Sequence, residues 1–170
     1  MRWFFLATAL LLGACVSPVV IDSQEGATLD QYRSYAFVEQ SEDHPRELDD
    51  QRARAALKTA LAEKGLSAAT AEQADVYVKH FFKREQRYDG SVFQFGFGFH
   101  RNNVGVGTTT PVEGDITEEY KLVVQMVDPA TNNVVWQATS RDRLYDEMRS
   151  ERRSEHIQKA VAEMFRRYPG

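Results

Sequence analysis

A single cysteine, Cys15, is the residue whose position most plainly indicates chemistry. It follows a short apolar run, Trp3–Leu12, and two small residues, Gly13 and Ala14. With the positive charge of Arg2 ahead of the run, this order is typical of a secretory signal peptide that ends at a small-residue cleavage site. The run has about half of the ~20 apolar residues that a helix needs to cross a bilayer, so we expect a signal and not a permanent transmembrane anchor.

The segment Leu12–Cys15 resembles a bacterial lipobox. The resemblance implies that the chain is cleaved before Cys15 and that the Cys15 thiol carries a lipid with palmitate-type acyl chains. Two or three such chains hold a protein stably on a membrane. The resemblance further implies that Val16, which stands where an aspartate would favour the inner membrane, directs the protein to the outer membrane of a Gram-negative bacterium. The alternative is an ordinary signal peptide followed by a cysteine by chance.

Other residue patterns give no comparable sign of chemistry. The four histidines, at positions 44, 80, 100 and 156, have no His or Cys at the spacing of zinc ligands. The glycines around Phe97 do not open a helix as a phosphate-binding loop does, and no serine lies in a G-x-S-x-G elbow. The carboxylate pairs Asp49–Asp50 and Glu118–Glu119 read as a helix start or a solvated face. We therefore expect no catalytic residue, no metal and no cofactor, although a hydrolase with an acidic pair stays open.

Length and charge limit the remaining classes. The chain has 170 residues, and removal of residues 1–14 leaves 20 basic and 25 acidic side chains, a net charge of −5. An acidic domain without a basic run is unsuited to nucleic acid, because phosphate contacts supply most of that affinity. We predict a signal peptide over residues 1–14, a tether over 15–28 and a single periplasmic domain over 29–170.

The hydrophobic pattern predicts two helices and several strands. Apolar residues recur at three-to-four spacing over 48–64, with Gly65 as a stop, and again from Ser150, the expected N-cap, to about Tyr168. Alternation predicts strands over 32–39, 74–88, 120–128 and 134–141, the last with Val134, Trp136 and Ala138 inward, and a short edge strand at 19–21 is an option. Short turns between strands favour a mostly antiparallel sheet with both helices on one face, a two-layer α+β sandwich.

A glycine- and aromatic-rich stretch between the second and third long strands is predicted to be a hairpin. We favour an Asn102–Asn103 turn, which would set Phe99 opposite Val106 and His100 opposite Gly105, over a turn longer by one residue, which would set Phe99 opposite Gly105. The phenylalanines are either core beneath the helices or an apolar contact surface for a partner or a membrane. The residues of this candidate contact surface are Phe93, Phe95, Phe97 and Phe99.

The final helix is locally basic. Its arginines are interleaved with glutamates at pairing distance, which favours a solvated face of paired charges over a lipid-headgroup site. The arginines are Arg149, Arg152, Arg153, Arg166 and Arg167.

Several pieces in this order resemble one family of bacterial outer-membrane lipoproteins, domain of unknown function 4136. Besides the lipobox, the matching pieces are the Tyr32–Phe37 strand, the Leu61–Leu66 helix end, Ala74–Val76, Leu122–Asp128, Val135–Trp136, and Ile157–Val161 with Tyr168–Pro169. Asn132–Asn133 stands where the family usually has a glycine, a mild departure because Asn tolerates left-handed backbone. The family has no assigned activity, so only Cys15 carries a role.

We therefore expect a lipid-anchored envelope protein, attached to the membrane through Cys15, whose domain binds an unknown envelope protein or ligand without catalysis. A small-molecule or lipid-binding periplasmic module is the alternative, and an envelope hydrolase with an acidic pair is a further one.

Overall fold

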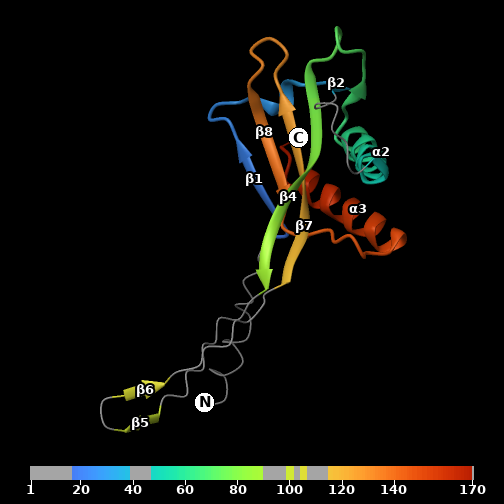
Figure 1. Cartoon of the computed structure of the whole chain (residues 1–170). Helices are drawn as coiled ribbons and strands as arrows, with labels where there is room; N and C mark the ends of the chain where they lie inside the picture. Colours follow the sequence, from blue (N-terminus) through green and yellow to red (C-terminus); the bar gives the residue numbers. More distant parts are fainter. Residues whose placement is uncertain (1–16, 39–46, 90–98, 102–103, 107–114, 170) are drawn as a thin grey trace, which may run out of the picture.

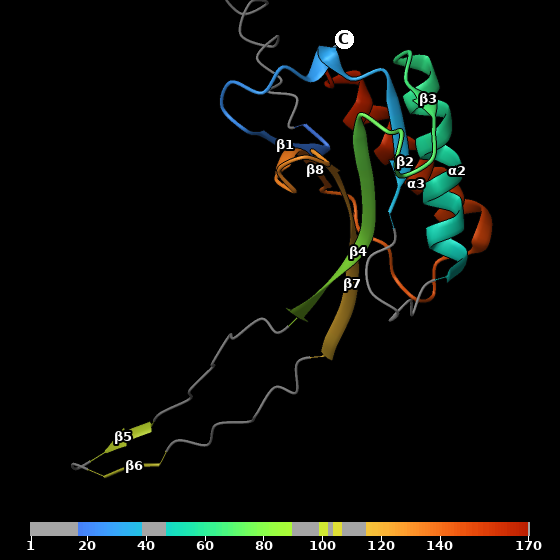
Figure 2. The same ribbon diagram turned by 90° about the horizontal axis from the view of Figure 1, so that it is seen from above.

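Alternating apolar residues build a six-stranded sheet, and two amphipathic helices cover one of its faces (Figures 1 and 2). The computed structural model describes residues 17–38, 47–89, 99–101, 104–106 and 115–169. The strands are β1 (Val19–Ser23), β2 (Ser34–Phe37), β3 (Ser67–Ala68), β4 (Val76–Asp89), β5 (Phe99–Arg101), β6 (Val104–Val106), β7 (Asp115–Val127) and β8 (Val134–Ser140), and the helices are the 3₁₀ turn η2 (Leu29–Gln31), α2 (Glu47–Glu63) and α3 (Ser150–Arg166).

The strand order in the main sheet is β1-β8-β7-β4-β2-β3. The pairs β1–β8, β8–β7 and β7–β4 are antiparallel, whereas β2 lies parallel to both β4 and β3. The parallel edge arises because α2 carries the chain across the sheet between β2 and β4. The predicted two-layer α+β architecture with a mostly antiparallel sheet is thus confirmed, and β1 is the optional edge strand at 19–21. The sheet begins at Val19, inside the segment 15–28 that was expected to be a tether.

Helix α2 forms and ends as its sequence predicts. Ala53, Leu57 and Leu61 are fully buried along one stripe. Gly65 has φ +79° and donates its N–H to the carbonyl of Ala62 at 2.9 Å, and the next N–H donates to Leu61 at 3.0 Å. This is a Schellman C-cap, which satisfies carbonyls at the helix end that have no partner within the helix.

Helix α3 keeps its predicted apolar stripe, with Ile157, Val161 and Met164 buried. The predicted N-cap was wrong by one residue, because Arg149 is the N-cap and Ser150 is the first helical residue. The Ser150 hydroxyl does not cap its own helix; its Oγ accepts a hydrogen bond from Arg52 Nη2 of α2 at 2.8 Å. The Ser150 hydroxyl thus bonds to a side chain of α2 and not to the backbone at the start of α3.

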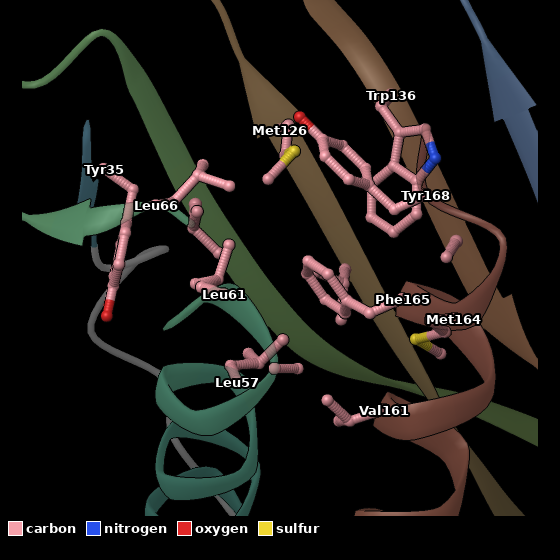
Figure 3. Packing of buried hydrophobic residues seen from close by; sticks show 14 of the residues in the cluster. Tyr35, Leu57, Leu61, Leu66, Met126, Trp136, Val161, Met164, Phe165 and Tyr168 are labelled. Atoms are coloured by element: carbon pink, nitrogen blue, oxygen red, sulfur yellow. The ribbon is translucent and has the colours of Figure 1, made fainter. Parts of the chain in front are cut away.

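Trp136 lies at the centre of the core, between the sheet and the end of α3 (Figure 3). Its ring centroid is 5.5 Å from those of Phe165 and Tyr168, and it is 1% exposed. The Tyr168 hydroxyl donates to the carbonyl of Leu29 at 3.0 Å, and burial raises the pKa of Tyr168 to about 12. The aromatic cluster therefore joins β8, α3 and the chain before β2.

The inward position predicted for Val134 was wrong, although Trp136 and Ala138 are inward. Val134 is 42% exposed. The register of β7 and β8 shifts between Met126 and Val127. Met126 pairs with Trp136 and Val127 pairs with Val134, so β8 advances by two residues where β7 advances by one. Such a β-bulge breaks the period of two on which the prediction relied.

We expect Trp136→Ala to be the most destabilising single truncation in the core. It would leave a cavity among packed aromatic rings and lower the free energy of unfolding by about 3–5 kcal/mol. Denaturant unfolding measures this loss, and Val134→Ala on the exposed side of the same strand is the matched control. Equal midpoints for the two variants would contradict the central role of Trp136.

Candidate interaction surface

Most residues of the predicted contact surface lie outside the described part of the chain. Cys15, Phe93, Phe95 and Phe97 belong to residues that the structure does not describe. Phe99 begins β5, where its Cα pairs with that of Val106, and the next pair joins His100 and Gly105. The predicted hairpin register with the shorter turn is confirmed at these positions.

The strands that lead to this hairpin form a two-stranded arm. β4 and β7 stay paired from Tyr77–Val127 to Asp89–Asp115 without a break. β2 pairs with β4 only as far as Val78, and β8 pairs with β7 only as far as Val123. Beyond these points the two strands continue past the helices, as Figures 1 and 2 show. We call residues 83–89 and 115–121 the arm.

On one face of the arm, like charges lie directly opposite each other, Lys83 against Lys121 and Glu85 against Glu119. One diagonal contact between the strands and one contact along β4 relieve the repulsion that such pairs cause. Lys121 Nζ lies 2.5 Å from Glu85 Oε2, and Lys83 Nζ lies 3.5 Å from Glu85 Oε1. The hydrogen bond from Lys121 lowers the pKa of Glu85. Glu119 is 2% exposed and pairs with Arg143 at 2.6 Å. The expectation that Glu119 is solvated was therefore wrong.

On the other face, Glu118 joins the two strands of the arm. Its Oε1 lies 3.5 Å from Arg84 Nη1, and its Oε2 accepts a hydrogen bond from the Tyr120 hydroxyl at 3.0 Å. Charged side chains along open strand edges discourage pairing with the strands of other molecules. The charged side chains described on the arm thus disfavour such pairing, and they do not converge on a reaction centre.

A buried ion pair joins α2 to α3 beside the base of the arm. Arg153 Nη1 donates to Asp49 Oδ2 at 2.9 Å, and these residues are 8% and 4% exposed. Arg153 also donates to the carbonyls of Tyr145 and Asp146, and Arg52 Nη1 donates to Asp49 Oδ1 at 2.8 Å. Asp49 lies in the first turn of α2, so the expected helix start is confirmed. Arg153 was expected on a solvated face, and this was wrong because Arg153 and Asp49 supply each other's counter-charge in the folded chain.

The hollows near this ion pair are lined mostly by charged side chains. One, of about 430 Å³, lies over Asp49, Arg153 and Tyr120, and another, of about 930 Å³, follows the first turns of α3. Pockets for small molecules are mostly apolar with few polar groups. Neither hollow has that character.

The histidines of the described residues do not form a metal site. His80 lies edge-on to Phe37, with ring centroids 6.0 Å apart, and its Nε2 is 4.0 Å from Asp50 Oδ1. It is half-buried. In the part of the chain that the structure describes, no group of three or more His, Cys, Asp or Glu side chains could hold a metal ion. No described helix is long and apolar enough to cross a membrane.

A family model, "Domain of unknown function (DUF4136)", matches residues 19–170. The chain belongs to the DUF4136 family. The match begins at the first residue of β1, so the edge strand lies within the family's domain. The predicted family is thereby confirmed.

Several solved structures are similar to this chain at low identity. A PDZ domain protein from Parabacteroides distasonis has a TM-score of 0.60 at 15% identity, covering 90% of this chain and 35% of that one. The chain therefore spans about a third of that protein's length. A DUF4136 family protein from Bacteroides thetaiotaomicron has a TM-score of 0.48 at 14% identity, covering 87% and 93% of the two chains. A minor lipoprotein from Acinetobacter baumannii has a TM-score of 0.36 at 9% identity, covering 80% and 88%. No curated protein matches the chain.

We expect Asp49→Ala to lower the free energy of unfolding by about 3–5 kcal/mol, because it leaves the buried guanidinium of Arg153 without its counter-charge. Glu47→Ala, two residues earlier and exposed, is the matched control and should cost less than about 1 kcal/mol. Thermal or urea unfolding gives both values. A loss in the Asp49 variant no larger than in the control would show that the ion pair does not hold the helices together.

Proposed function

We propose that this DUF4136 protein is an outer-membrane lipoprotein that faces the periplasm and acts as a non-catalytic interaction module. Acyl chains on Cys15 anchor it, and the arm carries the Phe93–Phe99 segment as its contact surface. The observation that supports the module most directly is the continuous β4–β7 pairing beyond the helices. A two-stranded ribbon buries little apolar surface of its own, so its extension gives stability to the fold only in small measure and is available for contact.

The charged groups of the described body support a role without catalysis. Asp49 and Arg153 neutralise each other, Glu119 pairs with Arg143, and Glu85 pairs with Lys121. These ion pairs hold neighbouring elements together.

The position of the sheet supports the anchor. The backbone of Pro18 is already bound to the body, since its carbonyl accepts the N–H of Arg141 at 2.8 Å. A chain that is attached at Cys15 therefore holds the domain close to the membrane surface.

We expect Cys15→Ser to release the protein from membranes or to leave it as uncleaved precursor. The thioether to the lipid requires the sulfur nucleophile, and a serine hydroxyl is a far weaker one. Metabolic labelling with palmitate, followed by membrane fractionation, measures the effect, with Ser17→Ala as the matched control. Palmitate that still enters the Cys15→Ser variant would overturn the anchor.

We expect the double variant Phe95→Ser, Phe97→Ser to keep its melting temperature and to lose the partners captured by crosslinking the lipidated protein in membranes. An apolar contact surface contributes to binding and not to the core. Val134→Ser, at an exposed apolar residue that begins β8, is the control and should keep those partners. A fall in melting temperature would assign the phenylalanines to the core instead, and a stable variant that retains its partners would contradict both interpretations.

A further inference from the structure

The described body starts very close to the anchoring cysteine. The Pro18 carbonyl accepts the N–H of Arg141, and the next residue, Val19, pairs with Ser140. Three residue steps separate Pro18 from Cys15. A fully extended chain covers at most about 11 Å in that number of steps. Covalent geometry alone therefore keeps the anchor within this distance of the Arg141 end of β8.

The arm leaves the body at this same end. Val123 pairs with Thr139, and the Leu122 N–H donates to Ser140 Oγ at 3.0 Å, so Pro18 and Arg141 lie about level with Lys121. β7 extends six residues further, from Lys121 to Asp115. At about 3.3 Å per residue this is roughly 20 Å, nearly twice the longest possible connection to the anchor. Figure 1 shows the arm continuing past the start of β1, away from the turn between β7 and β8.

The rest of the body lies in the opposite direction along the strands. β1 runs from Val19 away from the arm, and the turn between β7 and β8 closes the far end of the sheet. A body with charged helix faces cannot enter the hydrocarbon of a bilayer. With so short a connection, the body faces away from the membrane and the arm points toward the membrane or lies along it.

Two exposed apolar side chains flank the base of the arm. Leu48 is 65% exposed and lines the same hollow as Tyr120. Tyr145 is 37% exposed and follows Leu144, whose backbone forms a bridge with that of Tyr120. A tyrosine with an apolar ring and a polar tip suits the boundary between lipid and water.

The sequence that joins the two strands of the arm is also suited to lipid. Residues 90–114 include four phenylalanines and only two charged residues, Arg101 and Glu113, which are of opposite sign.

We propose that the β4–β7 arm contacts the lipid surface of the same membrane that holds Cys15, so that the protein is attached at two points. This inference rests on the lipidation proposed above. The membrane occupant is a phospholipid bilayer without a required anionic component, because the basic residues Lys83 and Lys121 contact Glu85 and the basic residue Arg84 contacts Glu118. The second attachment fixes the orientation of the domain on the membrane, which a single flexible anchor would leave free.

The test uses the mature, lipidated protein, whose Cys15 thiol is blocked by its thioether, so that one added cysteine can be labelled alone. Gln86→Cys places an environment-sensitive fluorophore on the exposed part of the arm, and Val134→Cys places it at the far end of the sheet. The labelled proteins are inserted into phosphatidylcholine vesicles that carry nitroxide headgroups. We expect the label at residue 86 to lose most of its emission and the label at residue 134 to keep it.

Lys83→Cys, on the opposite face of the arm and 62% exposed at its side chain, is the second variant if Gln86→Cys does not fold. Equal emission at the arm and at residue 134, in protein whose mass shows the lipid on Cys15, would overturn the proposal. Energy transfer between differently labelled arms without nitroxide quenching would overturn it in favour of contact between two copies of the chain. Protein that carries no lipid and does not float with vesicles would overturn the proposed anchor, and this inference with it.

Discussion

The unbroken antiparallel register between β4 and β7 is the constraint on which the rest of the structure depends. Inside the body it sets Val78 opposite Met126 and His80 opposite Val124, and these residues face the helices. Outside the body the same register forms the arm. Because side chains alternate with a period of two, a slip of one residue would turn the apolar side chains of a strand to the open face of the sheet. Core and arm are therefore specified together.

The two helices end their coverage of the sheet where the charge pattern changes. Asp49 and Arg153 hold α2 and α3 together at this level, and they are buried because each offers the other a counter-charge. Removing one partner is costlier than the pair is favourable, since an unpaired buried charge is left behind. The pair thus gives the helices a defined relative position more than it gives them stability.

At the other end of the body, short-range hydrogen bonds replace apolar packing. Asp75 accepts from the Ser34 hydroxyl at 2.8 Å and from the backbone N–H groups of Ser34 and Arg33 at 2.9 and 3.0 Å. These hydrogen bonds lower the pKa of Asp75, and the bond from the Ser34 hydroxyl has the largest effect. They place β2 beside β4, where only a few parallel pairs join the two strands. The Asp75 carboxylate therefore fixes β2 beside β4, and the aromatic cluster around Trp136 fixes the part of the sheet that contains β8.

What the sequence alone determined is local in the chain. The apolar stripes of both helices, the left-handed stop at Gly65 and the hairpin register at Phe99 each depend on residues a few positions apart, and each was predicted. The family resemblance also followed from the order of such local pieces.

Only the tertiary structure decided the features that join distant residues. The pairing of Asp49 with Arg153 spans 104 positions, and β1 joins the sheet through β8, more than a hundred residues later. The bulge that exposes Val134 depends on how β8 meets β7. Residue spacing also could not show that Pro18 and the arm lie at the same end of the sheet. In each case the partner's identity, and so the burial or exposure of the side chain, is set by folding and not by the sequence nearby.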